Sequence, residues 1–358
     1  MELKSEYMRT EEKVIFALRE LYTKYGYAQF KMSKFEEYDL YVRNKDFLVS
    51  DSVITFNDTN GKLMALKPDV TLSIIKNSAD TNGVQKLYYN ENVYRVSKNT
   101  HSFKEIMQTG LECIGDIGTY NICEVVTLAA KSLAAISPNF VLDISHMGLI
   151  SSVLEEIDSE TKKQILQYIS EKNTHDLAAL CEKENIESAV IVALINVCGT
   201  AEEIKEKLSA IPFGDNCSDA LSEINQVADI LMSLPEKDNI HFDFSIVNDM
   251  NYYSGIVFKG YIEGIPTGIL AGGRYDLLMS KMGKKCGAIG FAVYLDFLER
   301  FMEETKEYDT DILLLYNESD NLANVLKTVD TLTAQGNRVL AQTTVPEGLK
   351  YKTLLRFE

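Results

Sequence analysis

The sequence predicts an α+β protein with an antiparallel sheet flanked by helices, a helical insertion and a small C-terminal β-α-β unit. Three observations support this fold class. Apolar runs at 86–96 and 105–115, joined by a short polar loop, have the pattern of paired antiparallel strands. Between about 150 and 236, charged and aliphatic residues recur at helical spacing. After Tyr308 a single strand-helix-strand pattern follows, which is too small to form a doubly wound sheet alone.

The length and composition predict a globular protein of two or three domains. The chain has 358 residues, of which 46% are hydrophobic and 25% are charged. This length exceeds what one compact core normally holds, and the charged share is ordinary for a folded protein. No run approaches the ~18 apolar residues of a membrane helix. The N-terminal stretch "MELKSEYMRTEEK" lacks the apolar centre of a signal peptide, so we expect a cytoplasmic protein.

Charge and residue spacing argue against several functional classes. The net charge of −17 disfavours nucleic-acid binding, which needs Lys and Arg to replace counterions on phosphates. There is no C-x-x-C pair, so neither a disulfide framework nor a structural zinc site is expected. We also expect no other metal and no cofactor. The cysteines are expected to be reduced and mostly buried; they are Cys113, Cys123, Cys181, Cys198, Cys217 and Cys286.

The first elements along the chain are a helix and a hairpin. Residues 10–25 form the helix, with Thr10 as the expected N-cap and one apolar face made of Val14, Leu18 and Leu21. Residues 52–66 contain two short apolar runs around Asn60-Gly61, the dipeptide most typical of a hairpin turn.

The remaining elements follow from the same patterns. After the two long strands we expect a helix at about 120–136 and a strand at 140–146, and then the insertion, an all-helical packed subdomain without chemistry. Further strands are expected at 241–247, 255–261, 267–271 and 287–293, with helices at about 274–282 and 295–305. The last unit consists of strand 311–316, helix 321–336 and strand 337–343. The expected domains are therefore 1–305 and 306–358.

The stretch "GILAGGRYDLLMSKMG", residues 268–283, admits three interpretations. The glycine pair could form a phosphate loop, a strand-to-helix turn or the side of a ligand pocket, since glycine permits unusual backbone angles and close approach. It lacks the Lys-Ser/Thr of a Walker loop and the third glycine of a dinucleotide fingerprint. Taken alone, the stretch predicts a turn.

The order of several motifs bears on this choice. They are "YGYAQFKMSKFEEYDLY", "LKPDVT", "ENVYRV" with "IMQTGLECIGD", "NDMNYYSGIVF", "AGGRYD" and "GAIGFAVYLDFL". In this order, over about residues 8–300, they resemble the catalytic core of histidyl-tRNA synthetase, a class II aminoacyl-tRNA synthetase. The helical insertion also lies in the usual place. "AGGRYD" and the Tyr252-Tyr253 pair resemble the two histidine-recognition motifs, which implies that the glycine pair lines an amino-acid pocket.

The resemblance implies a set of pocket residues. Asp69 and Thr71 would face the α-ammonium of a bound histidine, and Tyr275 would offer its phenol to a ring nitrogen. A buried set of such groups discriminates between ligands, because a wrong ligand leaves the groups unsatisfied. The expected pocket residues are Asp69, Thr71, Arg95, Gln108, Glu112, Tyr252, Tyr253, Gly272, Gly273, Arg274 and Tyr275.

Strand geometry supports two members of this set independently. Gln108 and Glu112 are four residues apart in a predicted strand, so both side chains point to one face. Met107 and Leu111 then lie on the opposite, apolar face. This meets the geometric requirement for two residues that share a pocket.

The chain also departs from the synthetase pattern. Asn248 stands where the first histidine motif has an arginine, and Phe297 stands where the third class motif has another. Tyr294 replaces a glycine that leaves room for the nucleotide, and Asp249 adds a negative charge where a triphosphate would approach. Losing one preorganised donor costs on the order of 10²–10³ in rate. We therefore expect amino-acid activation to be lost.

Three further departures concern phosphate binding, the dimer interface and tRNA. The loop of the second class motif keeps Lys98 and Lys104, which cannot form the planar bidentate phosphate contact of arginine. Ser33 lies near the place of the first motif's proline, which bears on the detail of a dimer interface. Only about 50 residues follow Tyr308, fewer than an anticodon-binding domain of this class contains, so no tRNA binding is expected.

A chain that keeps the amino-acid pocket but is expected to lack activation chemistry resembles the regulatory subunits of ATP phosphoribosyltransferase. This resemblance implies a non-catalytic chain that works with a short-form catalytic subunit in the first step of histidine biosynthesis. It also implies histidine as the feedback ligand and a self-dimer within a hetero-oligomer, with no membrane partner. The feedback histidine could bind in the synthetase-like pocket or at the boundary with the catalytic subunit. Two alternatives stay open: a divergent histidyl-tRNA synthetase, and a synthetase-like binding module of another pathway.

Overall fold

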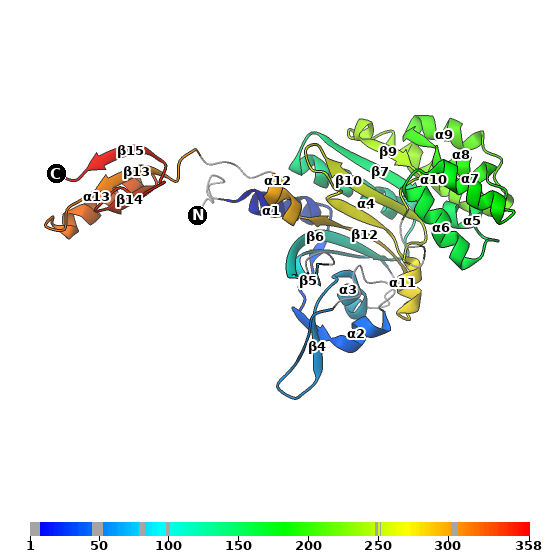
Figure 1. The fold of residues 1–358 in the computed structure, drawn as a ribbon, viewed down its shortest axis with the longest axis horizontal. Coiled ribbons are helices and arrows are strands. Elements are labelled where there is room, and N and C mark those ends of the chain that lie inside the picture. Colours follow the sequence, from blue (N-terminus) through cyan, green and yellow to red (C-terminus); the bar gives the residue numbers. More distant parts are fainter. Residues whose placement is uncertain are drawn as a thin grey trace. The chain divides into compact units, whose positions relative to one another are not determined.

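The computed structural model of the chain describes residues 8–44, 53–78, 83–97, 101–247, 250, 252–301 and 307–358. The chain divides into two compact units, Met1–Met302 and Glu303–Glu358, which are described separately (Figure 1). The expectations for Lys98, Asn248 and Asp249 fall outside the described residues. None of the described helices is long and apolar enough to cross a membrane.

A mainly antiparallel sheet forms the centre of the larger unit (Figure 1). Parallel pairing joins Ala28–Gln29 to Gln85–Val96, and Phe140–His146 to Ile240–Asp243. In spatial order the nine strands of this sheet, among the described residues, are β1 (Ala28–Gln29), β5 (Gln85–Val96), β6 (Phe103–Gly115), β12 (Gly287–Tyr294), β11 (Leu270–Arg274), β10 (Ile256–Ile262), β7 (Phe140–His146), β9 (Ile240–Asp243) and β8 (Cys198–Thr200).

The predicted long strand pair is confirmed, and its alternation separates the two faces of the sheet. Strands β5 and β6 pair antiparallel over their whole length. Leu111 and Cys113 of β6 join the larger core, while Ile114 joins a second, smaller core on the other face. Because side chains alternate along a strand, Gln108 and Glu112 lie on the face of Ile114. The sheet therefore places these two polar side chains together, away from Met107 and Leu111.

Two long helices cover the face of the larger core. Helix α4 (Thr119–Ile136), predicted at about 120–136, packs against β7, β10 and β12 (Figure 1). Helix α1 (Thr10–Lys24) buries Val14 and Leu18 against the same core. The expected cap at Thr10 is wrong, because Thr10 is the first helical residue. Arg9 occupies the cap position, and its backbone N–H donates to the side chain of Glu12, at 2.9 Å.

A small three-stranded sheet follows the first helix in the chain. It consists of β2 (Phe35–Glu37), β4 (Leu63–Leu66) and β3 (Thr55–Asn57), flanked by α2 (Tyr38–Arg43) and α3 (Thr71–Asn77). The predicted hairpin is confirmed, since β3 and β4 pair antiparallel on either side of the turn. Gly61 takes a φ of +78° in that turn, a value that side chains with a Cβ rarely adopt.

The insertion is helical except for one short strand. Its helices are α5 (Met147–Val153), α6 (Ser159–Ser170), α7 (Thr174–Lys183), α8 (Ala189–Ile195), α9 (Ala201–Ser209) and α10 (Ser218–Leu231). The expectation of an all-helical segment is wrong, because β8 pairs with β9 and extends the main sheet. The segment is also no separate subdomain. Its buried residues Leu177, Ile204 and Val227 belong to the same apolar cluster as Leu142 and Phe258 of the sheet.

Two predicted element boundaries near the glycine pair are also wrong. Strand β11 runs from Leu270 to Arg274, so Gly272 and Gly273 lie inside the strand and form no turn. Helix α11 (Asp276–Lys281) starts two residues later than expected, and α12 (Asp296–Phe301) follows β12. Upstream, β9 ends at Asp243, because Ser245 turns back and donates its hydroxyl to that carboxylate, at 2.6 Å.

The smaller unit contains one strand more than the sequence predicts. Strand β13 (Thr310–Leu315) pairs in parallel with β14 (Val339–Gln342) on one side, and helix α13 (Leu322–Ala334) connects the two. A further strand, β15 (Tyr351–Arg356), pairs in parallel on the other side. All of its residues except Tyr351 are exposed, so the run has little apolar periodicity to reveal it.

Candidate functional site

A buried carboxylate lies at the centre of the candidate site. Glu112 of β6 is only 2% exposed. Its Oε1 accepts a hydrogen bond from the Thr71 hydroxyl at 2.9 Å, and its Oε2 accepts one from the Tyr275 phenol at 2.5 Å. Burial raises the pKa of the Glu112 carboxyl to about 8, and the nearby Asp69 carboxylate adds to this effect. Because both donors are neutral hydroxyls, the site is suited to a cationic ligand group.

Glycines in the neighbouring strands make room for this carboxylate. Gly290 of β12 pairs with Glu112 across the sheet, and a Cβ at Gly290 would lie 1.8 Å from the Glu112 Oε2. Two residues before Glu112, a Cβ at Gly110 would lie 2.6 Å from the Tyr89 Oη. A glycine inside a strand weakens the sheet, so its presence indicates a close approach by another group. The Glu112 carboxylate and the Tyr89 phenol thus fill the space that side chains at Gly290 and Gly110 would need.

Three tyrosines form the aromatic side of the site. The ring centroid of Tyr252 lies 4.5 Å from that of Tyr253 and 5.9 Å from that of Tyr275. Burial raises the pKa of all three phenols, so they remain neutral at physiological pH and can donate or accept a hydrogen bond. A Cβ at Gly273 would lie 2.7 Å from the Tyr253 Cδ1. The glycine pair of "AGGRYD" therefore serves close packing of an aromatic ring.

A second carboxylate comes from the start of α3. The Asp69 carboxylate accepts the Leu72 backbone N–H at 2.9 Å, which ties it to the first turn of the helix. Burial raises the pKa of Asp69, while the Leu72 N–H and the nearby Arg95 guanidinium act in the opposite direction. Arg95 in turn donates its Nε to the Pro68 carbonyl at 3.0 Å. Asp69 and Glu112 therefore approach the same space from the helix and from the sheet.

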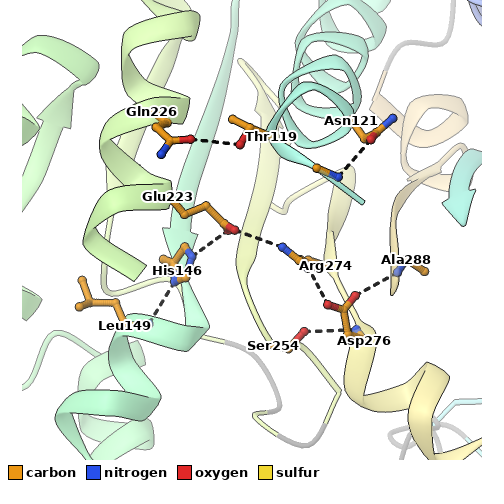
Figure 2. Close-up of polar contacts among 11 residues, drawn as sticks. Thr119, Asn121, His146, Leu149, Glu223, Gln226, Ser254, Arg274, Asp276 and Ala288 are labelled. Carbon is orange, nitrogen blue, oxygen red and sulfur yellow. Dashed lines mark hydrogen bonds and ion pairs between the residues drawn. The ribbon is translucent and has the colours of Figure 1, made fainter. Parts of the chain in front are cut away.

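Two further predicted pocket residues, Gln108 and Arg274, differ in their position relative to Glu112. Gln108 is 3% exposed and lies on the face of Glu112, paired across the sheet with Tyr294 of β12. Arg274 makes its ion pairs away from Glu112: its Nε donates to Asp276 at 2.8 Å and its Nη1 to Glu223 of the insertion at 3.1 Å (Figure 2). The structure therefore brings Asp69, Thr71, Glu112 and Tyr275 together, and places the Arg274 side chain in a separate polar cluster.

The comparisons with known proteins find a synthetase family model and relatives that are regulatory subunits. Residues 1–298 match the family model described as histidyl-tRNA synthetase. An ATP phosphoribosyltransferase regulatory subunit from Caldanaerobacter subterraneus subsp. tengcongensis is 30% identical over 288 residues, covering 78% of this chain and 75% of the relative. The chain belongs to the family of ATP phosphoribosyltransferase regulatory subunits. It is thus a regulatory, non-catalytic paralogue of histidyl-tRNA synthetase in histidine biosynthesis, as its sequence predicts.

Solved structures confirm the predicted class II synthetase-like fold. An ATP phosphoribosyltransferase regulatory subunit/histidyl-tRNA synthetase from Bacillus halodurans superposes with a TM-score of 0.78 at 22% identity, covering 99% of this chain and 96% of that one. A chain of the ATP phosphoribosyltransferase (HisG:HisZ) complex from Thermotoga maritima gives a TM-score of 0.64 at 18% identity, covering 82% and 98%. At these identities the likeness concerns the fold.

In this regulatory subunit, two residues that are expected to depart from the synthetase pattern, Phe297 and Tyr294, have clear surroundings. Phe297, at the place of a synthetase arginine, is half-buried and packs against the larger core. Burial raises the pKa of the Tyr294 phenol, which also senses the charges of Arg95 and Asp69 beside the candidate site. An apolar ring and a neutral phenol cannot supply the positive charge that nucleotide phosphates need.

Sequence reasoning on the regulatory subunit misses several residues of the site. Gly290 and Gly110 have a sequence signal, since each is a lone glycine within a predicted strand. Glu223 and His146 have none, because they come from the insertion and from the end of β7, far from the recognised motifs. Glu223 contacts Arg274, and His146 contacts Glu223. Only the fold reveals these two contacts.

Proposed function

We propose that the pocket around Glu112 binds histidine as the feedback signal of ATP phosphoribosyltransferase. One observation carries this proposal: the buried Glu112 carboxylate is held by the Thr71 hydroxyl and the Tyr275 phenol, and the rings of Tyr252 and Tyr253 lie beside Tyr275. The ligand's α-ammonium pairs with Glu112 and Asp69. Its imidazole, with one donor and one acceptor nitrogen, meets the phenols of Tyr275 and its neighbours. Gln108 lies beside the amino-acid backbone.

We propose further that the chain acts in a hetero-oligomer with a short-form catalytic subunit, itself dimeric within that assembly, in the cytoplasm. The structurally similar chain from the ATP phosphoribosyltransferase (HisG:HisZ) complex of Thermotoga maritima supports this partner. The acidic balance of −17 fits a protein partner better than tRNA. The six cysteines are free thiols, as expected in a reducing compartment. Feedback then requires histidine to bind one state of the complex better than another.

Reconstitution tests the partner. Mixing the chain with a short-form catalytic subunit from the same organism is expected to give a complex whose phosphoribosyltransferase activity histidine inhibits. Light scattering measures the complex, and conversion of ATP and phosphoribosyl pyrophosphate measures activity. Without complex formation at micromolar concentration, the partner assignment is wrong. Histidine-dependent ATP–pyrophosphate exchange by the chain alone would instead identify a divergent synthetase.

Replacing Tyr275 with phenylalanine tests how the imidazole is recognised. The substitution removes one phenol that bonds Glu112 and faces the ligand ring, so histidine should bind roughly fivefold to tenfold more weakly, as for one lost hydrogen bond. Amino acids without ring nitrogens should change little. Isothermal titration with histidine and with 2-aminobutyrate measures both. Unchanged feedback inhibition in the assembled complex would place the sensor at the subunit boundary.

A further inference from the structure

A polar cluster joins the helical insertion to Arg274, the last residue of β11, and to Asp276, the first residue of α11 (Figure 2). Glu223 of α10 accepts a hydrogen bond from the Arg274 Nη1 at 3.1 Å, and the Arg274 Nε donates to Asp276 at 2.8 Å. Tyr275 lies between Arg274 and Asp276 in the chain. Its phenol reaches Glu112 on the pocket side. The residues on both sides of this pocket tyrosine are therefore held by charged contacts.

Further hydrogen bonds hold the same segment to two neighbours. The Asp276 Oδ1 accepts the Ala288 backbone N–H at 3.0 Å, and the Asp276 backbone N–H donates to the Ser254 hydroxyl at 3.2 Å (Figure 2). The Tyr275 backbone N–H donates to the Ala288 carbonyl at 2.8 Å. Ser254 directly follows Tyr253. The cluster thus fixes the backbone beside two of the three pocket tyrosines.

His146 orients the insertion's carboxylate. Its Nδ1 accepts the Leu149 backbone N–H at 3.0 Å, so a neutral ring carries its proton on Nε2, which lies 3.0 Å from the Glu223 Oε1. Burial acts to raise the pKa of Glu223, but the contacts with His146 and Arg274 outweigh it and hold that pKa below its usual value. Glu223 is therefore a carboxylate with both oxygens engaged.

Three glycines from separate segments make space for the cluster. A Cβ at Gly148 would lie 2.9 Å from the His146 Cε1, and one at Gly287 would lie 2.7 Å from the Asp276 Oδ1. At Gly255 it would lie 3.1 Å from the Arg274 Cδ. The side chains of Glu223 and Arg274 are only 23% and 24% exposed, so their ion pair is less screened than one on the surface. The surrounding backbone is shaped to this ion pair.

We infer that Glu223 is a positioning residue for the histidine pocket and that helix α10 sets the pocket's affinity through Arg274. This inference rests on the proposed function of the pocket. With Glu223 neutral, Arg274 keeps Asp276 as its only charged partner among these contacts, so the backbone around Tyr275 is free to shift. The bond from Tyr275 to Glu112 then loosens. By linkage, a protein that binds the insertion and moves α10 changes histidine affinity, and histidine changes that protein's affinity by the same factor.

The test compares two substitutions on one helix in the full chain. Glu223→Gln keeps the side-chain shape and removes the charge. Gln226→Ala, one turn along α10, removes a different contact, the exposed 3.1 Å hydrogen bond from Thr119 at the start of α4 (Figure 2). Isothermal titration with histidine should show affinity lowered about fivefold or more for Glu223→Gln, within the usual range of coupling, and less than about twofold for Gln226→Ala. Equal effects of both would overturn the inference.

A double-mutant cycle separates positioning from general destabilisation. If Glu223 acts through the phenol, Glu223→Gln should weaken histidine less than about twofold in a Tyr275→Phe background. Full additivity, with both single effects multiplied, contradicts the inference.

Hydrogen–deuterium exchange of residues 270–288 in the ligand-free chain provides a readout that is independent of histidine. Faster exchange in Glu223→Gln than in Gln226→Ala supports the positioning role even if the wild type binds no histidine, an outcome that would sink the proposed function alone. Equal exchange in the two variants overturns the positioning role.

Discussion

Replacing Gly290 with alanine is expected to reduce histidine affinity about a hundredfold or more. The new methyl group would lie 1.8 Å from the Glu112 Oε2 and 2.4 Å from the Leu111 carbonyl oxygen, so the carboxylate must move. Displacement breaks its hydrogen bonds with Thr71 and Tyr275 and removes the charge that faces the ligand. The displaced carboxylate loses its charge-assisted contact with the ligand's ammonium, which is worth about 1.5–3 kcal/mol, and the upper part of this range gives the stated factor.

A second glycine substitution serves as the matched control. At Gly260 of β10 a Cβ would lie 2.6 Å from the Leu133 Cδ1 of α4, on the opposite face of the same sheet. Both alanine variants should lose about 1–3 kcal/mol of stability from overpacking, measured by denaturant unfolding. Only Gly290→Ala should lose histidine binding in calorimetric titrations. Wild-type affinity in Gly290→Ala would show that the ligand does not contact Glu112.

Replacing Glu112 with glutamine is expected to lower histidine affinity at least about tenfold and to remove the part of its pH dependence that comes from Glu112. The glutamine cannot pair with the ligand's ammonium, a contact worth about 1.5–3 kcal/mol. In the empty wild-type pocket, burial raises the pKa of Glu112 to about 8, so the group is mostly protonated at neutral pH. The ammonium must therefore displace a proton, and affinity should rise up to about tenfold per pH unit on approach to pH 8.

Comparing the two proteins at each pH isolates the contribution of Glu112. The imidazole of the ligand titrates equally in both experiments, so the difference in slope between pH 7 and pH 8 belongs to the carboxyl. Calorimetry in buffers of different ionisation enthalpy should also count close to one proton released by the wild type and less by Glu112→Gln. Parallel pH profiles would contradict the prediction.

The same carboxyl gives the ligand-free chain a defined dependence of stability on pH. Its folded pKa of about 8 lies above the ordinary value of 4.5, so the folded state binds the proton more tightly than the unfolded state. The stabilisation is fully present below about pH 4.5 and is lost as the pH rises through about 8. The free energy of unfolding of the wild type should therefore fall between about pH 5 and pH 8 more steeply than that of Glu112→Gln. Asp69, whose pKa is also raised by burial, adds a slope of the same sign.

Local patterns predict the sheet because they depend on neighbours in the chain. The pairing of β5 with β6 and the shared face of Gln108 and Glu112 follow from alternation alone. The glycine pair shows the limit of such reasoning. Gly272 and Gly273 resemble a turn by local propensity, yet they continue β11, because neighbouring strands and the Tyr253 ring leave no room for a Cβ.

The chemistry of the candidate site depends on contacts between distant parts of the chain. Tyr275 reaches Glu112 across 163 residues, and Arg274 reaches Glu223 across 51. The resemblance to a synthetase predicts that Glu112 and Tyr275 share a pocket, but not that the pKa of the Glu112 carboxyl is raised, because its desolvation arises from the packed fold. It also gives no reason to connect the insertion to the pocket.

The two outer strands of the main sheet bear on the solubility of the protein. Strand β8 has three residues, so the nine-stranded sheet ends on that side in a very short edge, and on the other side the two-residue β1 covers Leu87 and Tyr88 of β5. Short edges offer few unpaired backbone groups, which is one way that natural proteins avoid aggregation by strand addition. Copies of this chain and its partners are therefore expected to assemble through side-chain surfaces, and the sheet itself resists growth into fibres.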